Sequence, residues 1–463
     1  MRLLTLTLLL CACGGPSLPP PAQPLVRSPY AARPDAPPVH RVEAPTLPTP
    51  TRSEIAGGAT LLRAARPGLS ETRVVLVSRR GDDGAHPRGS VDVAAEVLEE
   101  QLEARFPHRD VNGRATHDLL MLRLDVAPEQ VPGVLGALAE HVRAPRVSAE
   151  ELERAREAWL RVLENPSTKT MLLFTALEHL HGGSDELDVH EALHQRLADL
   201  SAERVQAILA ERLAPSDVAL VVVGPHDAGA TEDAFRRAFG DWTGGAARRP
   251  AQRPALAPPA RAALSKPSGA SLAEVRYLCR APGFGARDRA PYELLIEILG
   301  GSSLGSRLNQ ELRTERGLTY AAGAYLDSSW GSDVLIVGAG LASDRVEDAL
   351  RRFFDQLRSL RRGPIAEAEL RTARTRLWAR LRHRAEGLAL AGLLARGWVH
   401  GLDADALGRR YAALAEVDQE ALGQVARRRL GPEFGLITLS GDFSQVGGFW
   451  VVRDERGLHL ERD

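Results

Sequence analysis

Cysteine, lysine and aromatic residues are scarce in this chain of 463 residues. Two of its three cysteines, Cys11 and Cys13, lie close to the N-terminus, so Cys279 is the only other thiol and has no partner for a disulfide in the rest of the chain. Lys169 and Lys266 are the only lysines, and the formal net charge is −1. A balance this close to neutral gives no overall electrostatic signal for nucleic acid, and we expect no nucleic-acid partner.

The N-terminus has a charged start and an apolar run, LLTLTLLL, that is too short to span a membrane as a mature helix. This pattern is typical of a secretory signal. The following Leu10-Cys11-Ala12-Cys13 resembles a bacterial lipobox, with Cys13 as the lipidated residue; an ordinary cleaved signal peptide is the alternative. We therefore expect residues 1–13 to be a lipoprotein signal peptide and the membrane to be a partner through the lipid anchor. Gly14 replaces the Asp that commonly retains lipoproteins at the inner membrane, which favours the outer membrane, facing the periplasm.

Two Pro-rich stretches without periodicity divide the chain. Residues 14–53 are expected to form an extended tether, and residues 246–265 a linker. The blocks that they delimit, 54–245 and 266–463, each have the length of an ordinary domain.

The two blocks repeat similar patterns in the same order. VSAEELERAREAWLRVL (147–163) matches IAEAELRTARTRLWARL (365–381), so that Arg156 falls opposite Arg374. Two further pairs of segments match at nearly the same offset. A duplicated domain of about two hundred residues explains this repeated order.

Each block begins with a strand-like run (72–80; 273–283) followed by an amphipathic helix (91–104; 290–299). Further strands, helices and a β run ending in glycine complete each block. Strands mixed with helix pairs predict the α+β class, with two homologous domains that each have a mixed or antiparallel sheet and helices packed on one face.

The second block carries a specific pattern, LLIEILGGSSLGSRLNQELRTERGLTYAAGAYLDSSWGSDVLIVGAGL (294–341). Its Gly-Gly-x-x-x-x-Ser-Arg-Leu, Glu-Leu-Arg and Arg-Gly-Leu-x-Tyr elements closely resemble the C-terminal domain signature of the insulinase/pitrilysin and mitochondrial processing peptidase family, a group of inverzincin metallopeptidases. The resemblance covers roughly residues 54 to 445 and is strongest in the second block. It implies the processing-peptidase-like metallohydrolase fold, with its repeated α+β domains.

Active members of this family carry an inverted zinc motif, HxxEH, on the first helix of the N-terminal domain. The two imidazoles bind zinc and the Glu activates water. Here the matching helix follows Gly89, and the two ligand positions hold Asp92 and Glu96 while the position of the catalytic Glu holds Ala95. The resemblance therefore implies a non-catalytic member that lacks HxxEH, with no cofactor expected in this chain.

A shifted register of the same helix places only carboxylates at the motif positions: Glu96, Glu99 and Glu100. The family's distant Glu ligand should fall in EAWLRVLENP, where Glu157 and Glu164 are nearby but Val162 fits about as well. An all-carboxylate cluster is a poor zinc site. A solvated helix face is the simpler interpretation.

In ELRTERGLTY, Arg313 and Tyr320 stand at the spacing of the family's Arg/Tyr pair, which in relatives contacts the substrate backbone. A guanidinium and a phenol can both donate to a peptide carbonyl. The resemblance thus implies that Arg313 and Tyr320 bind an unfolded peptide. The alternative is a surface ion pair for Arg313 and a half-buried strand position for Tyr320.

The segment His190-Glu191-Ala192-Leu193-His194 has the HExxH spacing of many zinc proteases. His190 and His194 would bind zinc on one helical face, with Glu191 as the base. Polar residues on both sides make any helix here short, and the active groove of the resembled family does not use this segment. An exposed histidine pair without metal is favoured, and a zinc protease that uses this motif is an alternative.

The resembled family includes pairs in which one subunit supplies zinc and the other the Arg/Tyr side. The resemblance therefore implies that this chain is not catalytic alone and is the partner of an HxxEH-bearing subunit in peptide hydrolysis, with zinc in that subunit. An alternative from another class is a catalytically silent envelope module for binding or assembly.

Overall fold

The computed structural model describes most of the chain from residue 43 onward. The described residues are 43–82, 86–87, 89–116, 118–164, 195–244, 261–265, 271–301, 304–327, 333–431, 435–441, 449–454 and 457–462. The side chains of 162–164, 261–265, 440–441, 449–454 and 457–462 are not included. The expected signal peptide with Cys13, the larger part of the expected tether and the segment His190–His194 lie outside the described residues. Residues Val42–Asp463 form one compact unit.

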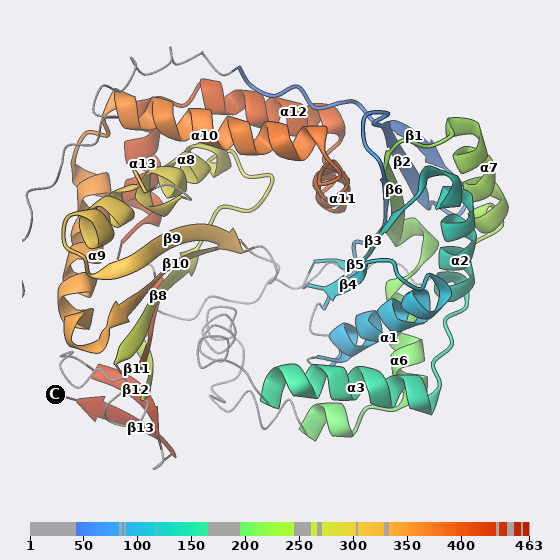
Figure 1. Ribbon diagram of the computed structural model, residues 1–463, viewed down its shortest axis with the longest axis horizontal. Coiled ribbons are helices and arrows are strands. Elements are labelled where there is room, and N and C mark those ends of the chain that lie inside the picture. The colour runs from blue at the N-terminus through green and yellow to red at the C-terminus, as the bar shows by residue number, and fades with distance from the viewer. Residues whose placement is uncertain are drawn as a thin grey trace, which may run out of the picture. The chain divides into compact units, whose positions relative to one another are not determined.

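The first half of the chain contains a six-stranded sheet with the order β1-β2-β6-β3-β5-β4 among the described residues (Figure 1). Its strands are β1 (Thr51–Glu54), β2 (Thr60–Ala65), β3 (Thr72–Ser78), β4 (Val111–Ala115), β5 (Leu120–Val126) and β6 (Val218–Gly224). Strands β2 and β6 pair in parallel and every other pair is antiparallel.

The second half contains a seven-stranded sheet with the order β13-β12-β7-β11-β8-β10-β9 among the described residues. Its strands are β7 (Arg261–Ser265), β8 (Leu272–Arg280), β9 (Thr319–Asp327), β10 (Val334–Ala342), β11 (Gly435–Gly441), β12 (Phe449–Asp454) and β13 (Gly457–Arg462). The run β7-β11-β8-β10-β9 repeats the order and the strand directions of β2-β6-β3-β5-β4. The predicted fold class, two homologous α+β domains with mixed sheets, is confirmed.

Helices of each half cover one face of the sheet in that half (Figure 1). The first half has α1 (Ser90–Arg105), η2 (Pro128–Gln130), α2 (Val131–Arg143), α3 (Ala149–Glu164), α6 (Ala202–Arg212), η3 (Pro215–Asp217) and α7 (Ala228–Phe239). The second half has α8 (Arg289–Gly300), η4 (Asn309–Thr314), η5 (Ser343–Arg345), α9 (Val346–Arg362), α10 (Glu367–Glu386), α11 (Leu390–Val399), α12 (Ala404–Ala412), η6 (Ala413–Ala415) and α13 (Gln419–Arg429). Among the described residues, no helix has both the length and the hydropathy that crossing a bilayer requires.

Matching arginines hold matching loops in the two halves. On α3, Arg156 donates to the carbonyls of Leu197 and Leu200, at 2.8 and 2.6 Å. On α10, Arg374 donates in the same way to the carbonyls of Leu414 and Val417, at 2.9 and 2.7 Å. Each pair of carbonyls precedes the N-cap of the next helix, Ser201 for α6 and Asp418 for α13. The repeated contact is what a duplication predicts.

The first sheet is covered on both faces, which the one-face prediction did not include. Helix α11 of the second half packs on β3 and β6, and β6 is buried along its whole length. Its sequence, Val-Ala-Leu-Val-Val-Val-Gly, is continuously apolar and not alternating, as expected for a strand with two buried faces. Arg79 of the first half also lies over the Trp398 ring of α11, at 5.0 Å.

Two expected boundary segments contribute strands to the sheets. Residues Arg261–Ser265, the end of the expected linker, form β7, which pairs in parallel with β11 and β12. Strand β1 begins at Thr51, within the expected tether. The composition of these two segments did not predict strands. They form strands because they pair with neighbouring strands of the sheets.

Candidate functional site

Helix α1, where active relatives would carry their zinc motif, begins directly after Gly89. Gly89 has φ +79°, a backbone conformation that glycine adopts without strain. The spacing of Asp92, Glu96 and Glu99 at four and three residues places these carboxylates on one helical face. Ala95, at the expected position of the catalytic Glu, is 2% exposed and belongs to the apolar core.

The pKa values of Asp92, Glu96 and Glu99 on α1 are all raised. Burial, together with the nearby Asp82 carboxylate, raises the pKa of Asp92 to about 8. Burial also raises the pKa of Glu99 to about 7, although its carboxylate accepts a 2.6 Å hydrogen bond from the Gly113 N–H of β4. The pKa of Glu96 is raised by burial and by Glu100 and other acids. Burial and like charge both disfavour the ionised form on this face.

This face does not fit the catalytic zinc of the resembled family. Such sites need imidazole ligands and a carboxylate to activate water, but the motif positions hold two carboxyls and the methyl group of Ala95. In the described part of the chain, no three His, Cys, Asp or Glu side chains are grouped so as to hold a metal ion.

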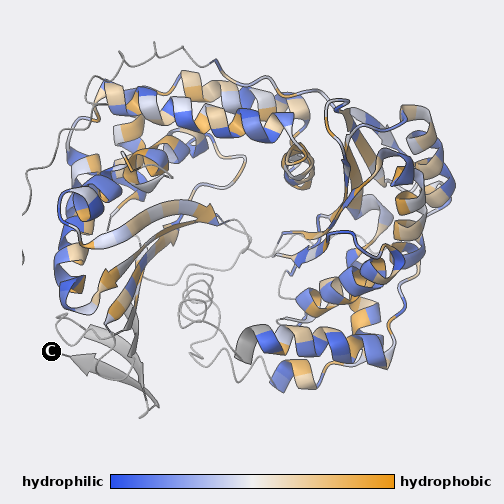
Figure 2. Ribbon diagram, viewed as in Figure 1, coloured by the Kyte–Doolittle hydropathy of each residue, from blue (hydrophilic) through white to orange (hydrophobic). Residues whose placement is uncertain are grey.

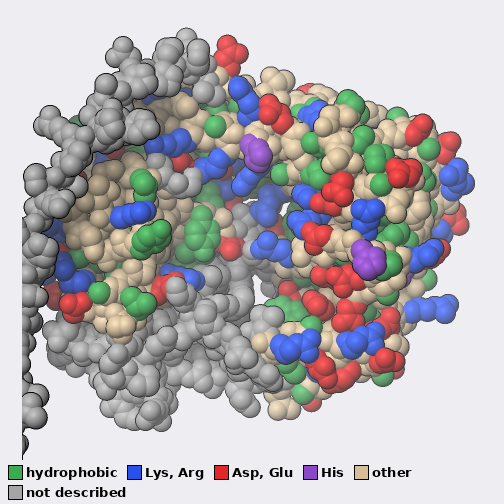
Figure 3. Space-filling model, in the orientation of Figure 1, with side chains coloured by type: hydrophobic (Ala, Val, Ile, Leu, Met, Phe, Trp, Pro, Cys, Tyr) green, Lys and Arg blue, Asp and Glu red, His purple; other side chains and the backbone are tan. Residues whose placement is uncertain are grey.

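The candidates for the distant ligand do not complete a site among the described residues. Glu157 pairs along its own helix with Arg161, at 3.6 Å, and its side chain is 60% exposed. The side chains of Val162 and Glu164 are not described. Helix α3 instead meets α1 through Arg154, which pairs with Glu100 at 3.2 Å. Acidic and basic side chains lie side by side over the region of these two helices (Figure 3).

In the second half, Arg313 and Tyr320 lie together at the edge of the sheet. The Arg313 guanidinium lies over the Tyr320 ring, 4.8 Å from its centre. No carboxylate of the described residues pairs with Arg313, and Tyr320 is 84% exposed. The ion-pair and half-buried alternatives for these two residues therefore do not apply. A cation stacked on an open aromatic ring leaves its N–H donors free for another acceptor.

The local backbone explains why Tyr320 faces outward. Arg313 lies in a π-helical turn, η4, which ends at Thr314, and Gly317 shortly after it has φ +61°. The register between β9 and β10 then shifts, so that Tyr320 and Ala321 of β9 form a bulge opposite Gly340 of β10. The Thr319 hydroxyl lies 2.6 Å from the Gly340 carbonyl and accepts a hydrogen bond from the Ala321 N–H. Bulges re-aim side chains in this way.

Asn309 links the π-helical turn to the edge strand, a role that sequence reasoning missed. Its side-chain amide donates to the Ala322 carbonyl at 2.8 Å and accepts from the Ala322 N–H at 3.1 Å. The Asn309 side chain thus forms hydrogen bonds with both the N–H and the C=O of Ala322, as the backbone of a neighbouring strand would. No sequence signal identified it, because its acceptor lies on a separate element.

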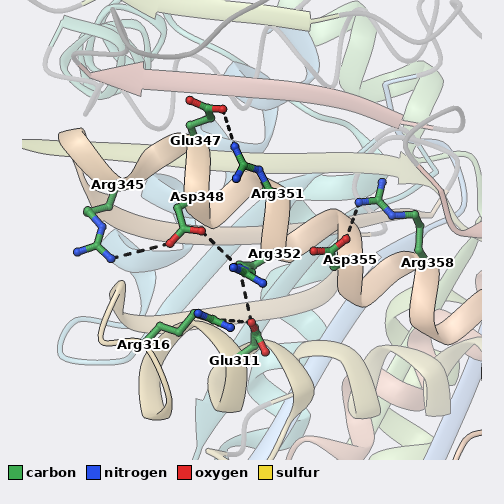
Figure 4. Close-up of polar contacts among 9 residues, drawn as sticks. All are labelled: Glu311, Arg316, Arg345, Glu347, Asp348, Arg351, Arg352, Asp355 and Arg358. Carbon is green, nitrogen blue, oxygen red and sulfur yellow. Dashed lines mark hydrogen bonds and ion pairs between the residues drawn. The ribbon is translucent and has the colours of Figure 1, made fainter.

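Glu311 anchors the outer side of the same turn (Figure 4). Its carboxylate accepts from Arg316 at 2.7 Å and lies 4.0 Å from Arg352 of α9. Arg316 is thereby committed to an ion pair, whereas Arg313, three residues earlier, is not. Arg313 therefore faces outward, and Arg316 stabilises the turn through its ion pair with Glu311.

Comparison with known proteins shows which family the middle of the chain resembles. Residues 199–377, which include Arg313 and Tyr320, match the family described as "Peptidase M16 inactive domain". Over these residues the chain is an M16 peptidase homologue. The matched residues do not include α1, where the zinc motif of active relatives would lie.

Curated relatives of the M16 homologue match over a short segment. Proteins of Mycobacterium tuberculosis and Mycobacterium bovis, named uncharacterized zinc proteases, are 41% identical over 90 residues. That segment is 19% of this chain and 20% of each relative. The match thus spans about a fifth of the length of these curated relatives.

Solved structures similar to the M16 homologue share its fold over 85% or more of its length. A peptidase M16 inactive domain from Pseudomonas fluorescens has a TM-score of 0.72 at 19% identity and is covered over 98% of its length. A protease from Helicobacter pylori has a TM-score of 0.71 at 17% identity and is covered completely. The first half of the periplasmic protease PqqL from Escherichia coli has a TM-score of 0.68 at 13% identity and is covered over 93%.

Proposed function

We propose that this M16 homologue is the non-catalytic subunit of a two-subunit peptidase. It would present Arg313 and Tyr320 to an unfolded peptide, while an HxxEH-bearing partner supplies zinc and the catalytic Glu. The observation that carries the proposal is the contrast between its two candidate faces. The zinc-motif face has lost its imidazoles, and the Arg/Tyr face retains an outward pair with donors free for a peptide carbonyl.

The proposal includes a location in the cell envelope. The lipobox-like Cys13 supports a lipid anchor, and the Pro-rich tether would let the folded unit reach a partner near the membrane. Gly14 supports the outer membrane, facing the periplasm. Mass spectrometry of the exported protein tests this directly, since an unmodified or absent Cys13 would contradict the anchor.

Reconstitution tests the subunit role. The full chain and an M16 peptidase with intact HxxEH from the same cell would be purified alone and together, then given unfolded peptides. We expect cleavage to require both chains and to fall at least tenfold with Arg313→Ala, because one donor to the transition state is lost. Arg351→Ala is the matched control, because Arg351 is an exposed arginine of α9 that pairs with Glu347. Equal effects of the two substitutions would reject the role of Arg313.

The two alternatives give different results in the same preparations. A silent binding or assembly module would form a complex but leave the partner's turnover unchanged. A self-sufficient protease would contain stoichiometric zinc that is lost with His190→Ala. Metal analysis of the purified full chain separates this alternative from the others, and we expect less than stoichiometric zinc.

A further inference from the structure

A single histidine joins the segment before α1 to helix α6. His86 lies between β3 and α1, and only 9% of its surface is exposed. Its Nε2 lies 3.1 Å from the Glu211 carboxylate, and its Nδ1 lies 3.1 Å from the Arg204 guanidinium. Arg204 and Glu211 both belong to α6, where a spacing of two helical turns places them on the same face. The imidazole therefore bridges two turns of α6.

The two partners of His86 define its protonation state. A guanidinium has only N–H groups and cannot accept a hydrogen bond, so Nδ1 must be the acceptor in the contact with Arg204. Nε2 then carries the proton and donates to Glu211. One donor and one acceptor nitrogen are the mark of a neutral imidazole. A second proton, on Nδ1, would turn an N–H toward another N–H and break the contact with Arg204.

The surroundings of His86 also oppose a second proton. Burial is the largest cause that lowers the pKa of His86 from its ordinary value of 6.5, and the cations Arg212 and Arg204 act in the same direction. The Glu211 carboxylate raises this pKa, but the Glu211 side chain is 41% exposed, so solvent weakens the attraction. The neutral ring is therefore the form that suits the folded protein.

The C-terminal end of α6 is fixed by contacts that do not involve His86. The Ser78 hydroxyl donates to the Arg212 carbonyl, at the end of α6. Arg80 donates to the Glu211 carbonyl at 3.2 Å and pairs with Asp217 at 2.5 Å. Loss of the His86 contact would leave this end of α6 in place.

The start of α1, in contrast, has few polar contacts to hold it. Its N-cap residue is Gly89, so no side chain caps the first turn. The Ser90 N–H bonds to the Pro87 carbonyl at 3.1 Å, one residue after His86. Further along, hydrophobic bands alternate with hydrophilic ones (Figure 2), and the buried apolar residues of α1 belong to the core of the first half. Release of His86 would thus loosen the first turn without exposing this core.

We propose that His86 is a pH-sensitive link between the start of α1 and α6. The neutral ring holds the two elements together, and a second proton separates the ring from Arg204 and frees the first turn of α1. Because the pKa of His86 is lowered in the folded state, its contribution to stability is present above about pH 6.5 and is lost as pH falls below that value. The link depends on neither a catalytic partner nor a lipid anchor.

Histidine NMR and hydrogen exchange of the full chain test the proposal. His86→Gln is the decisive variant, because its amide oxygen can accept from Arg204 and its amide N–H can donate to Glu211, but it takes up no proton. Arg204→Gln removes one cation and keeps a donor. His383→Gln, at an exposed position of α10, is the matched control. The imidazole signal that disappears in His86→Gln identifies His86.

We expect the His86 imidazole to titrate below 6.5, its ordinary value. Arg204→Gln should raise this midpoint, and His383→Gln should leave it unchanged. At pH 5, amide exchange in the first turns of α1 should be about fivefold faster in the unaltered chain than in His86→Gln, since one pKa unit is a tenfold change in an equilibrium. At pH 7.5 the two chains should agree within about twofold.

The two chains are compared at the same pH, so the intrinsic dependence of exchange on pH cancels. The opposite contribution of Asp92 is common to both chains and cancels as well. A His86 midpoint at or above 6.5, or equal exchange in the unaltered chain and His86→Gln at pH 5, would overturn the proposal. The NMR titration of the unaltered chain decides the question even where a substitution disturbs the fold.

Discussion

Arg156 and Arg374 hold matching loops with the same two-carbonyl contact, whereas the matching helices α1 and α8 differ along a whole face. Counted from the first helical residue, the places of Glu96 and Glu99 in α1 are taken in α8 by Leu295 and Ile298, which are 0% and 4% exposed. The contacts that close each domain have been kept in both halves. The helix face that differs has not been kept, since it is acidic in α1 and apolar in α8.

The largest effect should come from breaking the shared contact. Arg156→Ala and Arg374→Ala each remove a charged donor from two backbone carbonyls, which would cost about 3 kcal/mol of unfolding free energy. Denaturant unfolding of the full chain measures both values, and exposed Arg371→Ala is the control, with an expected cost below about 0.5 kcal/mol. A large loss for only one of the pair would show that the two contacts are not equivalent.

Asn309 sharpens the comparison of the two edge strands. Glu99 forms one hydrogen bond with the backbone of β4, whereas Asn309 forms two with the backbone of β9. We expect Asn309→Ala to cost about 2 kcal/mol, since it strands both backbone groups of the buried Ala322. Glu99→Gln should cost less, because the amide oxygen can still accept from Gly113. Denaturant unfolding orders the two variants, and the reverse order would contradict this account.

Acid dependence distinguishes the α1 face from its apolar counterpart. The folded-state pKa of Asp92, about 8, lies above its ordinary value of 3.8. The folded state therefore binds more protons between these values, and the contribution of Asp92 to stability falls as pH rises from about 4 to about 8. Asp92→Asn should flatten this slope and raise stability at pH 8 by about 1 kcal/mol.

Unfolding midpoints at pH 5 and pH 8 would check the prediction for Asp92. Exposed Glu157→Gln is the control and should leave the slope as it is in the unaltered chain. A slope that persists in Asp92→Asn would remove Asp92 as its origin.

The smallest effect should come from the outward Tyr320. Its ring is almost entirely exposed, so Tyr320→Ala should change the unfolding free energy by less than about 0.5 kcal/mol. The same variant should weaken peptide turnover with a catalytic partner. A stability loss above about 1 kcal/mol would mean that Tyr320 serves the fold of the edge strand.

Sequence reasoning succeeded where patterns are local. The periodicity at 91–104 and 290–299 located α1 and α8 to within a residue, and the repeated order of segments predicted the repeated sheets. It did not predict the strands β1 and β7 in the expected tether and linker, because these strands form by pairing with neighbouring strands. It could not find Asn309 or Glu311, since their partners are distant in sequence or on another element.

The sequence by itself determined the α+β class, the duplication, the missing imidazoles at Asp92 and Glu96, and the spacing of Arg313 and Tyr320. These follow from residue identity and short-range periodicity. Only the tertiary structure decided that Arg313 stacks on an open Tyr320 without a carboxylate partner among the described residues, and that Arg351, Arg352 and Arg358 of α9 pair with carboxylates. Side-chain pairing and exposure depend on which elements pack together, and the chain order of residues does not specify that.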